Sequence, residues 1–180
     1  MKKFDIVVVG GGHAGIEAAS AGARMGCSVG LVTMDRFALG RMSCNPAIGG
    51  TAKGHLVREI DALGGIMGLI SDKTGIQFRM LNKSKGPAVW SPRCQSDRRL
   101  YSEEAYHFIS LTKNLEIVEE SAVEVLAESG KIIGIKTQNG EEIHCKALIL
   151  SSGTFLNGLM HTGLNKTSGG RYGEQPAIGI

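Results

Sequence analysis

The sequence has no long apolar segment and few aromatic residues. No run of about 18 apolar residues occurs in its 180 residues, so we expect no transmembrane helix. Phe, Tyr and Trp make up only 5% of the chain, but an apolar content of 42% is enough to build a globular core. A strand pattern begins near residue 4, which leaves no room for a signal peptide. These absences favour a cytoplasmic protein without a membrane anchor.

Closely spaced cysteines are also missing. The four cysteines, Cys27, Cys44, Cys94 and Cys145, form no C-x-x-C pair and show no metal-ligand spacing. We therefore expect reduced thiols and no metal site. The formal net charge of +3 is small, but the charges are unevenly distributed along the chain.

Glycine, by contrast, is abundant, and three of the 26 glycines directly follow the first strand pattern. The run from Phe4 to Val9 leads into Gly10-x-Gly12-x-x-Gly15, and an alanine-rich helix pattern follows. Such a turn places backbone N–H groups and the positive end of a helix dipole against a pyrophosphate. The alternative is a purely structural turn. The predicted cofactor-binding residues are Gly10, Gly11, Gly12, His13, Ala14 and Gly15.

One feature of an ordinary NAD site is absent. An acidic residue usually ends the second strand and holds the ribose hydroxyls, but Thr33 occupies that position and Asp35 follows two residues later. A threonine accepts or donates a hydrogen bond without the added strength of a charge. This departure argues against an NAD dehydrogenase.

The second half of the chain changes from helical to strand periodicity. We predict strands at 115–119, 122–127, 131–137, 141–145 and 147–150, separated by turns such as Gln138-Asn139-Gly140. A β-meander at about residues 121–146 is typical of flavoproteins that bind two dinucleotides. In those proteins the last apolar strand ends in a turn beside the flavin nucleotide, which here contains Gly153. The pattern therefore favours FAD over NAD.

The middle of the chain reads as helices and loops. Apolar spacing predicts helices over 53–63 and about 96–113, and alternation predicts a strand over 75–81 with Ile76, Phe78 and Met80 on one face. Asn-Pro and Gly-Gly pairs predict an irregular loop over 39–54, and Ser91-Pro92-Arg93 reads as a loop. Within the first loop, Cys44 is either a catalytic nucleophile or a small buried residue.

Basic residues concentrate between Arg79 and Arg99, with Asp97 the single acid among them. Cations on loops beside Trp90 suit a polyanion, such as RNA or a polyglutamylated cofactor. The plainer interpretation is a solvated surface. The residues expected to hold a polyanion are Lys85, Arg93, Arg98 and Arg99.

Several longer motifs resemble the GidA/MnmG family of FAD-dependent tRNA-modifying enzymes, and the resemblance covers almost the whole chain. They are Gly10 to Gly15, Met42 to Gly50, Lys53 to Val57, Asp61 to Gly65, Ser84 to Val89 and Ser168 to Arg171. The resemblance implies an α/β, Rossmann-like two-dinucleotide-binding FAD domain with a parallel sheet, flanking helices and the inserted meander. Residues 1–180 would be the N-terminal part of that domain in a longer protein.

The resemblance also implies an activity. Such enzymes add a carboxymethylaminomethyl or aminomethyl group to C5 of the wobble uridine of tRNA, using NADH and methylenetetrahydrofolate. They act with a GTPase partner of the MnmE family and are expected to be homodimers. Cys44 matches a cysteine implicated in catalysis, as nucleophile or general base. Val123, or its neighbour Ala122, would meet the adenine through the backbone, and Ala177 falls where relatives often have a serine that touches FAD.

Two other functions remain open. One is a related flavoenzyme, such as the folate-dependent tRNA uridine methyltransferase. The other is a non-catalytic module that binds RNA or a GTPase. Flavin absorbance after purification separates the enzymes from such a module.

Overall fold

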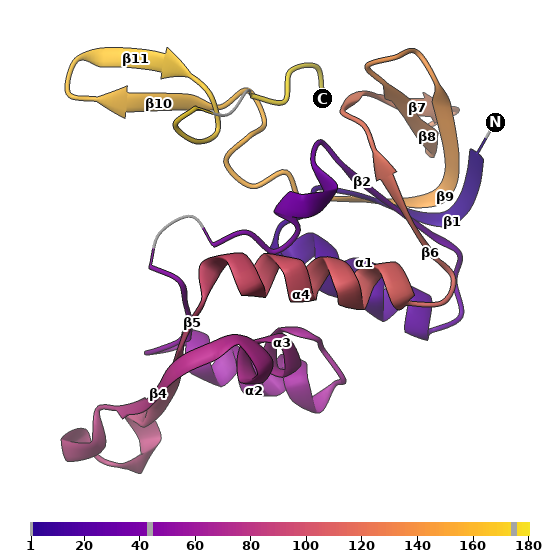
Figure 1. Ribbon diagram of the computed structural model, residues 1–180. Helices are drawn as coiled ribbons and strands as arrows, with labels where there is room; N and C mark the ends of the chain where they lie inside the picture. Colours follow the sequence, from indigo (N-terminus) through magenta and orange to yellow (C-terminus); the bar gives the residue numbers. More distant parts are fainter. Residues whose placement is uncertain (1, 43–44, 174–175) are drawn as a thin grey trace. The chain divides into compact units, whose positions relative to one another are not determined.

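The computed structural model describes residues 2–42, 45–173 and 176–180, and the chain divides into two compact units. Unit 1 consists of the chain up to Arg36 together with Thr112–Ile180, and unit 2 is Phe37–Leu111. Figure 1 shows the elements of both units. None of the described helices is long and apolar enough to cross a membrane.

Unit 1 is built on a six-stranded sheet with the order β6-β2-β1-β9-β8-β7. Strands β1 (Lys2–Val9), β2 (Val29–Thr33), β6 (Leu115–Glu119) and β9 (Glu142–Leu150) are parallel, while β8 (Lys131–Thr137) and β7 (Ala122–Glu128) complete it antiparallel. Helix α1 (His13–Arg24) packs against β1 and β2. Every residue of β2 is buried, as expected for an apolar strand inside a parallel sheet.

The two edge strands of this sheet, β6 and β7, are joined by only Glu120 and Ser121. The sheet therefore has to curl until its edges meet at this link (Figure 1). The Glu120 N–H donates to the Thr33 carbonyl at 2.9 Å, and the Gln138 N–H donates to the Ser121 carbonyl at 2.8 Å. Side chains from all six strands meet inside the curl. The core consists of Phe4, Val7, Val32, Val118, Ala122, Ile135, Ile143 and Cys145.

The predicted strands and helices of unit 1 are confirmed, with one correction and one addition. The two strands expected at 141–145 and 147–150 are a single strand, β9, which pairs with β1 along its length and with β8 near its start. The polar Lys146 between them does not interrupt the strand, because it points to solvent and binds Asp5. In the glycine-rich tail, β10 (Leu159–Thr162) and β11 (Asn165–Ser168) form an antiparallel hairpin that the sequence pattern did not predict.

Unit 2 contains a three-stranded antiparallel sheet with the order β3-β5-β4 and three helices. The strands are β3 (Ala47–Gly49), β5 (Ser91–Ser96) and β4 (Gly75–Leu81). The helices are α2 (Lys53–Ala62), α3 (Met67–Thr74) and α4 (Arg98–Leu111), and both α2 and α3 pack against β5. Short 3₁₀ turns η1 (Arg36–Ala38), η2 (Lys83–Lys85) and η3 (Pro87–Val89) occur in loops, η1 at the unit boundary.

Strand β5 corrects the expectation of a loop at Ser91-Pro92-Arg93. Proline is tolerated there because β3 ends at Gly49, opposite Arg93, so the ladder on that side stops before Pro92. The Pro92 carbonyl instead accepts the Gly50 N–H at 2.8 Å. The Leu39–Gly54 segment was likewise expected to be irregular throughout, but Ala47–Gly49 forms β3, and α3 was not predicted at all.

Candidate nucleotide-binding site

The three glycines of the Gly10-x-Gly12-x-x-Gly15 motif between β1 and α1 have three different roles. Gly10 has φ +112°, and a Cβ there would lie 2.4 Å from the Ser151 carbonyl oxygen. A Cβ on Gly15 would lie 1.8 Å from the Gly10 carbonyl oxygen, so this glycine lets the helix approach the strand. Gly12 has φ −72°, which any residue adopts, and a Cβ there would meet no atom within 4 Å. Among these three glycines, Gly12 is the one that packing within the protein does not explain.

Gly12 is also the N-cap of α1. It has no side chain to cap the first N–H groups of the helix, and the first helical turn contains no acidic residue. The positive end of the helix dipole therefore points to an exposed position where no Cβ intervenes. A pyrophosphate is a suitable ligand for such a cradle.

Ser151 holds the glycine turn in place from the neighbouring strand. Its hydroxyl donates toward the carbonyl oxygens of Val9 at 3.0 Å and Gly10 at 3.2 Å, and its backbone N–H donates to Val9 at 2.8 Å. The sequence pattern predicted the turn that contains Gly153 but not this role of Ser151. A serine directly after an apolar strand pattern was the available signal. Two residues later, Gly153 has φ +59° and open space around its Cβ position.

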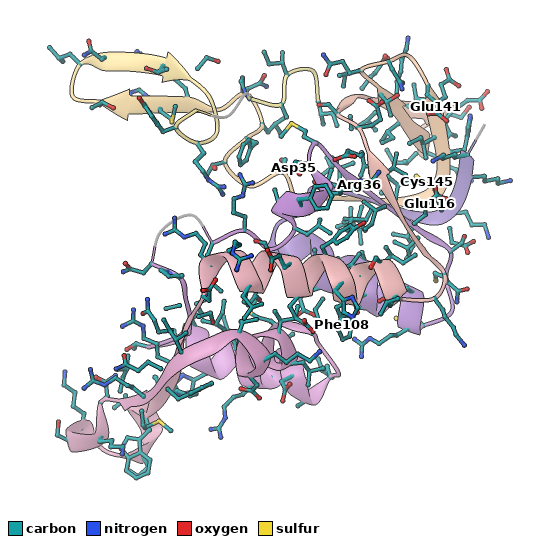
Figure 2. The ribbon with its side chains drawn as sticks, in the orientation of Figure 1. Asp35, Arg36, Phe108, Glu116, Glu141 and Cys145 are labelled. Atoms are coloured by element: carbon teal, nitrogen blue, oxygen red, sulfur yellow. The ribbon has the colours of Figure 1, made fainter. Side chains whose placement is uncertain are left out.

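Thr33 lies at the end of β2, beside the glycine turn at the end of β1. Its hydroxyl donates to the Asp35 carbonyl at 3.2 Å, and the residue is nearly buried. Asp35 and Arg36 follow it (Figure 2). Arg36 binds Glu119 at the end of β6 through its backbone N–H at 3.1 Å and its Nε at 2.7 Å. These contacts lower the pKa of Glu119, the backbone N–H contributing most.

The structure thus brings Gly10, Thr33 and Gly153 together at the carboxyl ends of three adjacent parallel strands, β1, β2 and β9. In open α/β sheets, ligands bind at this edge. The residues predicted from the glycine motif and from the last apolar strand therefore lie at the same edge of the sheet.

Val123 and Ala177 lie elsewhere in unit 1. Pairing of β7 with β8 passes from Ala122 to Glu124, which makes Val123 the extra residue of a β-bulge. A bulge leaves backbone groups outside the ladder. Ala177 is held by backbone hydrogen bonds to Phe155 and Asn157, both 2.9 Å. Close to it in the tail, a Cβ on Gly179 would lie 2.4 Å from the Val123 carbonyl, so the tail reaches the bulge.

The predicted polyanion-binding residues all lie in unit 2. Lys85 is exposed in η2, Arg93 is half-buried on β5, and Arg98 and Arg99 are exposed at the start of α4. Arg99 forms an ion pair with Glu103 at 2.7 Å. Cys44, the predicted catalytic residue, lies outside the residues that the structure describes.

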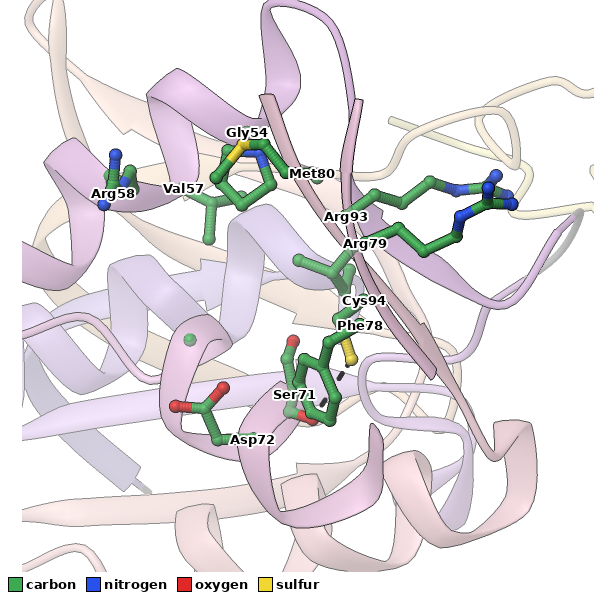
Figure 3. Close-up of a pocket in the computed structure, with 14 residues that line it drawn as sticks. Gly54, Val57, Arg58, Ser71, Asp72, Phe78, Arg79, Met80, Arg93 and Cys94 are labelled. Carbon is green, nitrogen blue, oxygen red and sulfur yellow. Dashed lines mark hydrogen bonds between the residues drawn. The ribbon is translucent and has the colours of Figure 1, made fainter. Parts of the chain in front are cut away.

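Unit 2 also contains a shallow pocket of about 340 Å³ between its sheet and the helices α2 and α3 (Figure 3). Val57, Ser71, Phe78 and Cys94 contribute to its lining, and the Cys94 thiol donates to the Ser71 carbonyl at 3.4 Å. Among the described residues, no group of three or more His, Cys, Asp or Glu side chains is placed to hold a metal ion.

Comparison with known proteins agrees with this geometry. Residues 5–180 match the family described as glucose inhibited division protein A, GidA. The tRNA uridine 5-carboxymethylaminomethyl modification enzyme MnmG of Protochlamydia amoebophila is 53% identical over 178 residues, which cover 99% of this chain and 28% of that protein.

Solved structures give the same result. The structure of Aquifex aeolicus GidA in its form I crystal superposes with a TM-score of 0.96 at 49% identity, covering 99% of this chain and 30% of that one. A probable FAD-dependent monooxygenase from Pseudomonas aeruginosa, pqsL, shares the fold alone, with a TM-score of 0.59 at 14% identity, covering 85% of this chain and 43% of that one. The chain spans under a third of the length of its MnmG and GidA relatives. It belongs to the GidA family.

Proposed function

We propose that the complete protein is an FAD-dependent enzyme that adds a carboxymethylaminomethyl or aminomethyl group to C5 of the wobble uridine of tRNA. The observation that carries this proposal is the 53% identity to an MnmG enzyme across 99% of the chain. That relative is a tRNA uridine 5-carboxymethylaminomethyl modification enzyme, and because this chain covers only 28% of it, the activity is proposed for the whole protein.

The residues of the glycine turn fit FAD. Gly12 leaves open space at the start of α1, and its backbone angles do not require glycine, so a ligand that approaches the backbone accounts for the missing side chain. Gly10, Gly11, His13, Ala14 and Gly15 would surround the pyrophosphate. When bound, FAD would accept electrons from NADH and pass on the one-carbon unit of methylenetetrahydrofolate.

Other residues of unit 1 would position the rest of the cofactor. Thr33 offers an uncharged hydroxyl where NAD sites carry a carboxylate, which supports FAD over NAD. The bulge at Val123 leaves backbone groups for an adenine, and Gly153 leaves room beside the end of β9. Ala177 has no polar side chain, so any contact it makes with FAD is through its backbone.

The chemistry on the uracil needs a residue that this chain supplies at Cys44. Uracil C5 is a poor nucleophile until a group adds to C6, and a thiolate is well suited to that addition. We assign this role, or that of a general base, to Cys44. The substrate tRNA, a GTPase of the MnmE family as partner, a homodimer and a cytoplasmic location complete the proposal.

The experiment is purification of the full-length protein followed by mass analysis of tRNA nucleosides. We expect a yellow protein with a flavin spectrum and a carboxymethylaminomethyl- or aminomethyluridine at the wobble position, formed with NADH and methylenetetrahydrofolate. A methylated uridine in its place would assign the protein to folate-dependent methylation. A colourless protein that binds tRNA or a GTPase without modifying tRNA would be a binding module.

A further inference from the structure

Two arginines of unit 2 face each other across a β-ladder. Arg79 on β4 and Arg93 on β5 are register partners in the antiparallel pair. Directly opposed residues bring their Cβ atoms to about 5 Å, and like charges in such positions are destabilising. Figure 3 shows the two side chains running in the same direction, with their guanidinium groups next to each other.

No described residue of this sheet neutralises the pair. Strands β3, β4 and β5 contain no aspartate or glutamate. Within the described parts of the chain, no ion pair involves Arg79 or Arg93. Arg93 contacts Gln95 on its own strand, at 3.5 Å between Nη2 and Oε1. Two uncompensated positive charges are therefore kept side by side at a cost in folding free energy.

Strand alternation places the pair on one face of the sheet and Phe78 and Cys94 on the other. All four residues contribute to the lining of the pocket, but Cys94 is buried there, whereas Figure 3 shows both guanidinium groups lying away from Phe78 and Cys94. On the face of Arg79 and Arg93, the β3 partner of Arg93 is Gly49, which has no side chain to cover the guanidinium groups.

We propose that Arg79 and Arg93 together bind one phosphate of the tRNA backbone. A guanidinium group is planar and can donate two parallel hydrogen bonds to two oxygens of a phosphate. Two guanidinium groups side by side on one face therefore form a phosphate site without further rearrangement. This inference rests on the proposed function, since it names the part of unit 2 that holds the nucleic acid.

A polyanion fits better than a small anion because the positive charge continues beyond the pair. The loop that joins β4 to β5 carries the exposed Lys83 and Lys85. Trp90 ends the same loop, half-exposed, with its Nε1–H donating to the Lys83 carbonyl at 3.2 Å. Successive cations beside an aromatic ring suit the phosphates and bases of RNA.

The test uses the full-length protein and unmodified substrate tRNA, with binding measured at several salt concentrations. Arg79→Gln and Arg93→Gln should each weaken binding about tenfold and reduce the slope of log K against log salt by about 1. Arg58→Gln on α2 removes an exposed charge from the same unit and is the matched control, with affinity expected within about twofold. Arg93→Lys should keep the salt slope but lose affinity, because it retains the charge without the fork.

Two further readouts separate a ligand site from a structural role. Because the pair is repulsive, Arg79→Gln should unfold at the same or a higher temperature than the wild type. The Arg79→Gln, Arg93→Gln double variant should lose less affinity than the product of the two single losses, since both arginines act on one phosphate.

Unchanged affinity and salt slope in the double variant would overturn the proposal, while flavin content and wobble modification would still report on the proposed function separately. A raised KM for polyglutamylated methylenetetrahydrofolate with unchanged tRNA binding would also overturn it, in favour of a folate carboxylate. Losses that multiply would assign the two arginines to separate anions and contradict a shared phosphate.

Discussion

Gly15 of α1 lies so close to Gly10 that a Cβ on Gly15 would be 1.8 Å from the Gly10 carbonyl oxygen. The Gly10 carbonyl cannot easily move away, because it belongs to the backbone of a turn that the Ser151 hydroxyl also holds. Three residues earlier, the Gly12 position is open. Packing therefore explains the glycine at one position of the motif but not at the other.

This difference predicts opposite behaviour for two matched substitutions. Gly15→Ala should lower the free energy of unfolding by about 3 kcal/mol, because the helix must move away from the turn. Gly12→Val should leave the stability of the flavin-free protein within about 0.5 kcal/mol of wild type but abolish flavin binding. Thermal unfolding and the flavin absorbance of the purified full-length variants measure both effects. A Gly12→Val protein that retains its flavin would place the cofactor elsewhere.

Asp5 predicts an acid-sensitive contact between β1 and its neighbours. Its carboxylate binds the Lys146 ammonium at 2.7 Å and accepts from the Ser28 N–H and hydroxyl at 2.9 and 2.8 Å, and these bonds, Lys146 first, hold its pKa well below the usual range. A carboxyl group with a lowered folded-state pKa stabilises the fold above its unfolded pKa of about 4. That contribution is lost as the pH falls below 4.

The matched variant is Asp5→Asn, which keeps the shape of the side chain without its charge. Its melting temperature should lie below that of the wild type at pH 7, and the difference should shrink between pH 5 and pH 2, measured by thermal unfolding across that range. A constant difference would mean that the charge of Asp5 does not contribute.

We predict that replacing Cys44 abolishes the modification of tRNA but leaves the protein folded. Cys44→Ser should keep FAD and still be reduced by NADH, yet leave the wobble uridine unmodified in mass analysis, because a hydroxyl is a far weaker nucleophile than a thiolate. Cys94→Ser is the matched control. Its thiol is buried against Ser71 and Ser96, so the change should affect stability by about 1 kcal/mol and leave modification intact. Wild-type modification by Cys44→Ser would end the catalytic assignment.

Beyond the arginine pair, Lys85, Arg98 and Arg99 are predicted to add to tRNA binding. Replacing all three with alanine should weaken binding and flatten its salt dependence, since fewer counterions are released. The exposed ion pair of Arg99 with Glu103 contributes little to folding, so the melting temperature should change little. Lys131→Ala, in unit 1, removes an exposed charge outside the predicted set as a control. Salt slopes that match the wild type would identify these residues as ordinary surface.

The sequence alone determined those parts of the protein that depend on local pattern. The strand, glycine turn and helix from Phe4 to Arg24 are consecutive in the chain, so their periodicity and the spacing of Gly10, Gly12 and Gly15 were sufficient. The β-meander was also predicted well, because alternation and turn residues such as Gln138-Asn139-Gly140 are local signals. The motifs around residues 42–50 identified the family by resemblance, although the role of Cys44 stays a prediction.

Only the tertiary structure decided what depends on residues far apart in the sequence. Pro92 suggested a loop, but β3 ends at Gly49, opposite Arg93, so no β3 residue pairs with Pro92 and a strand is possible there. The opposition of Arg79 and Arg93 depends on the register of two strands that a nine-residue segment, 82–90, separates. Likewise, Ser151 lies 141 residues from Gly10 and meets it because β9 pairs with β1. Pairing between distant strands brings such groups together, and periodicity within one segment carries no information about it.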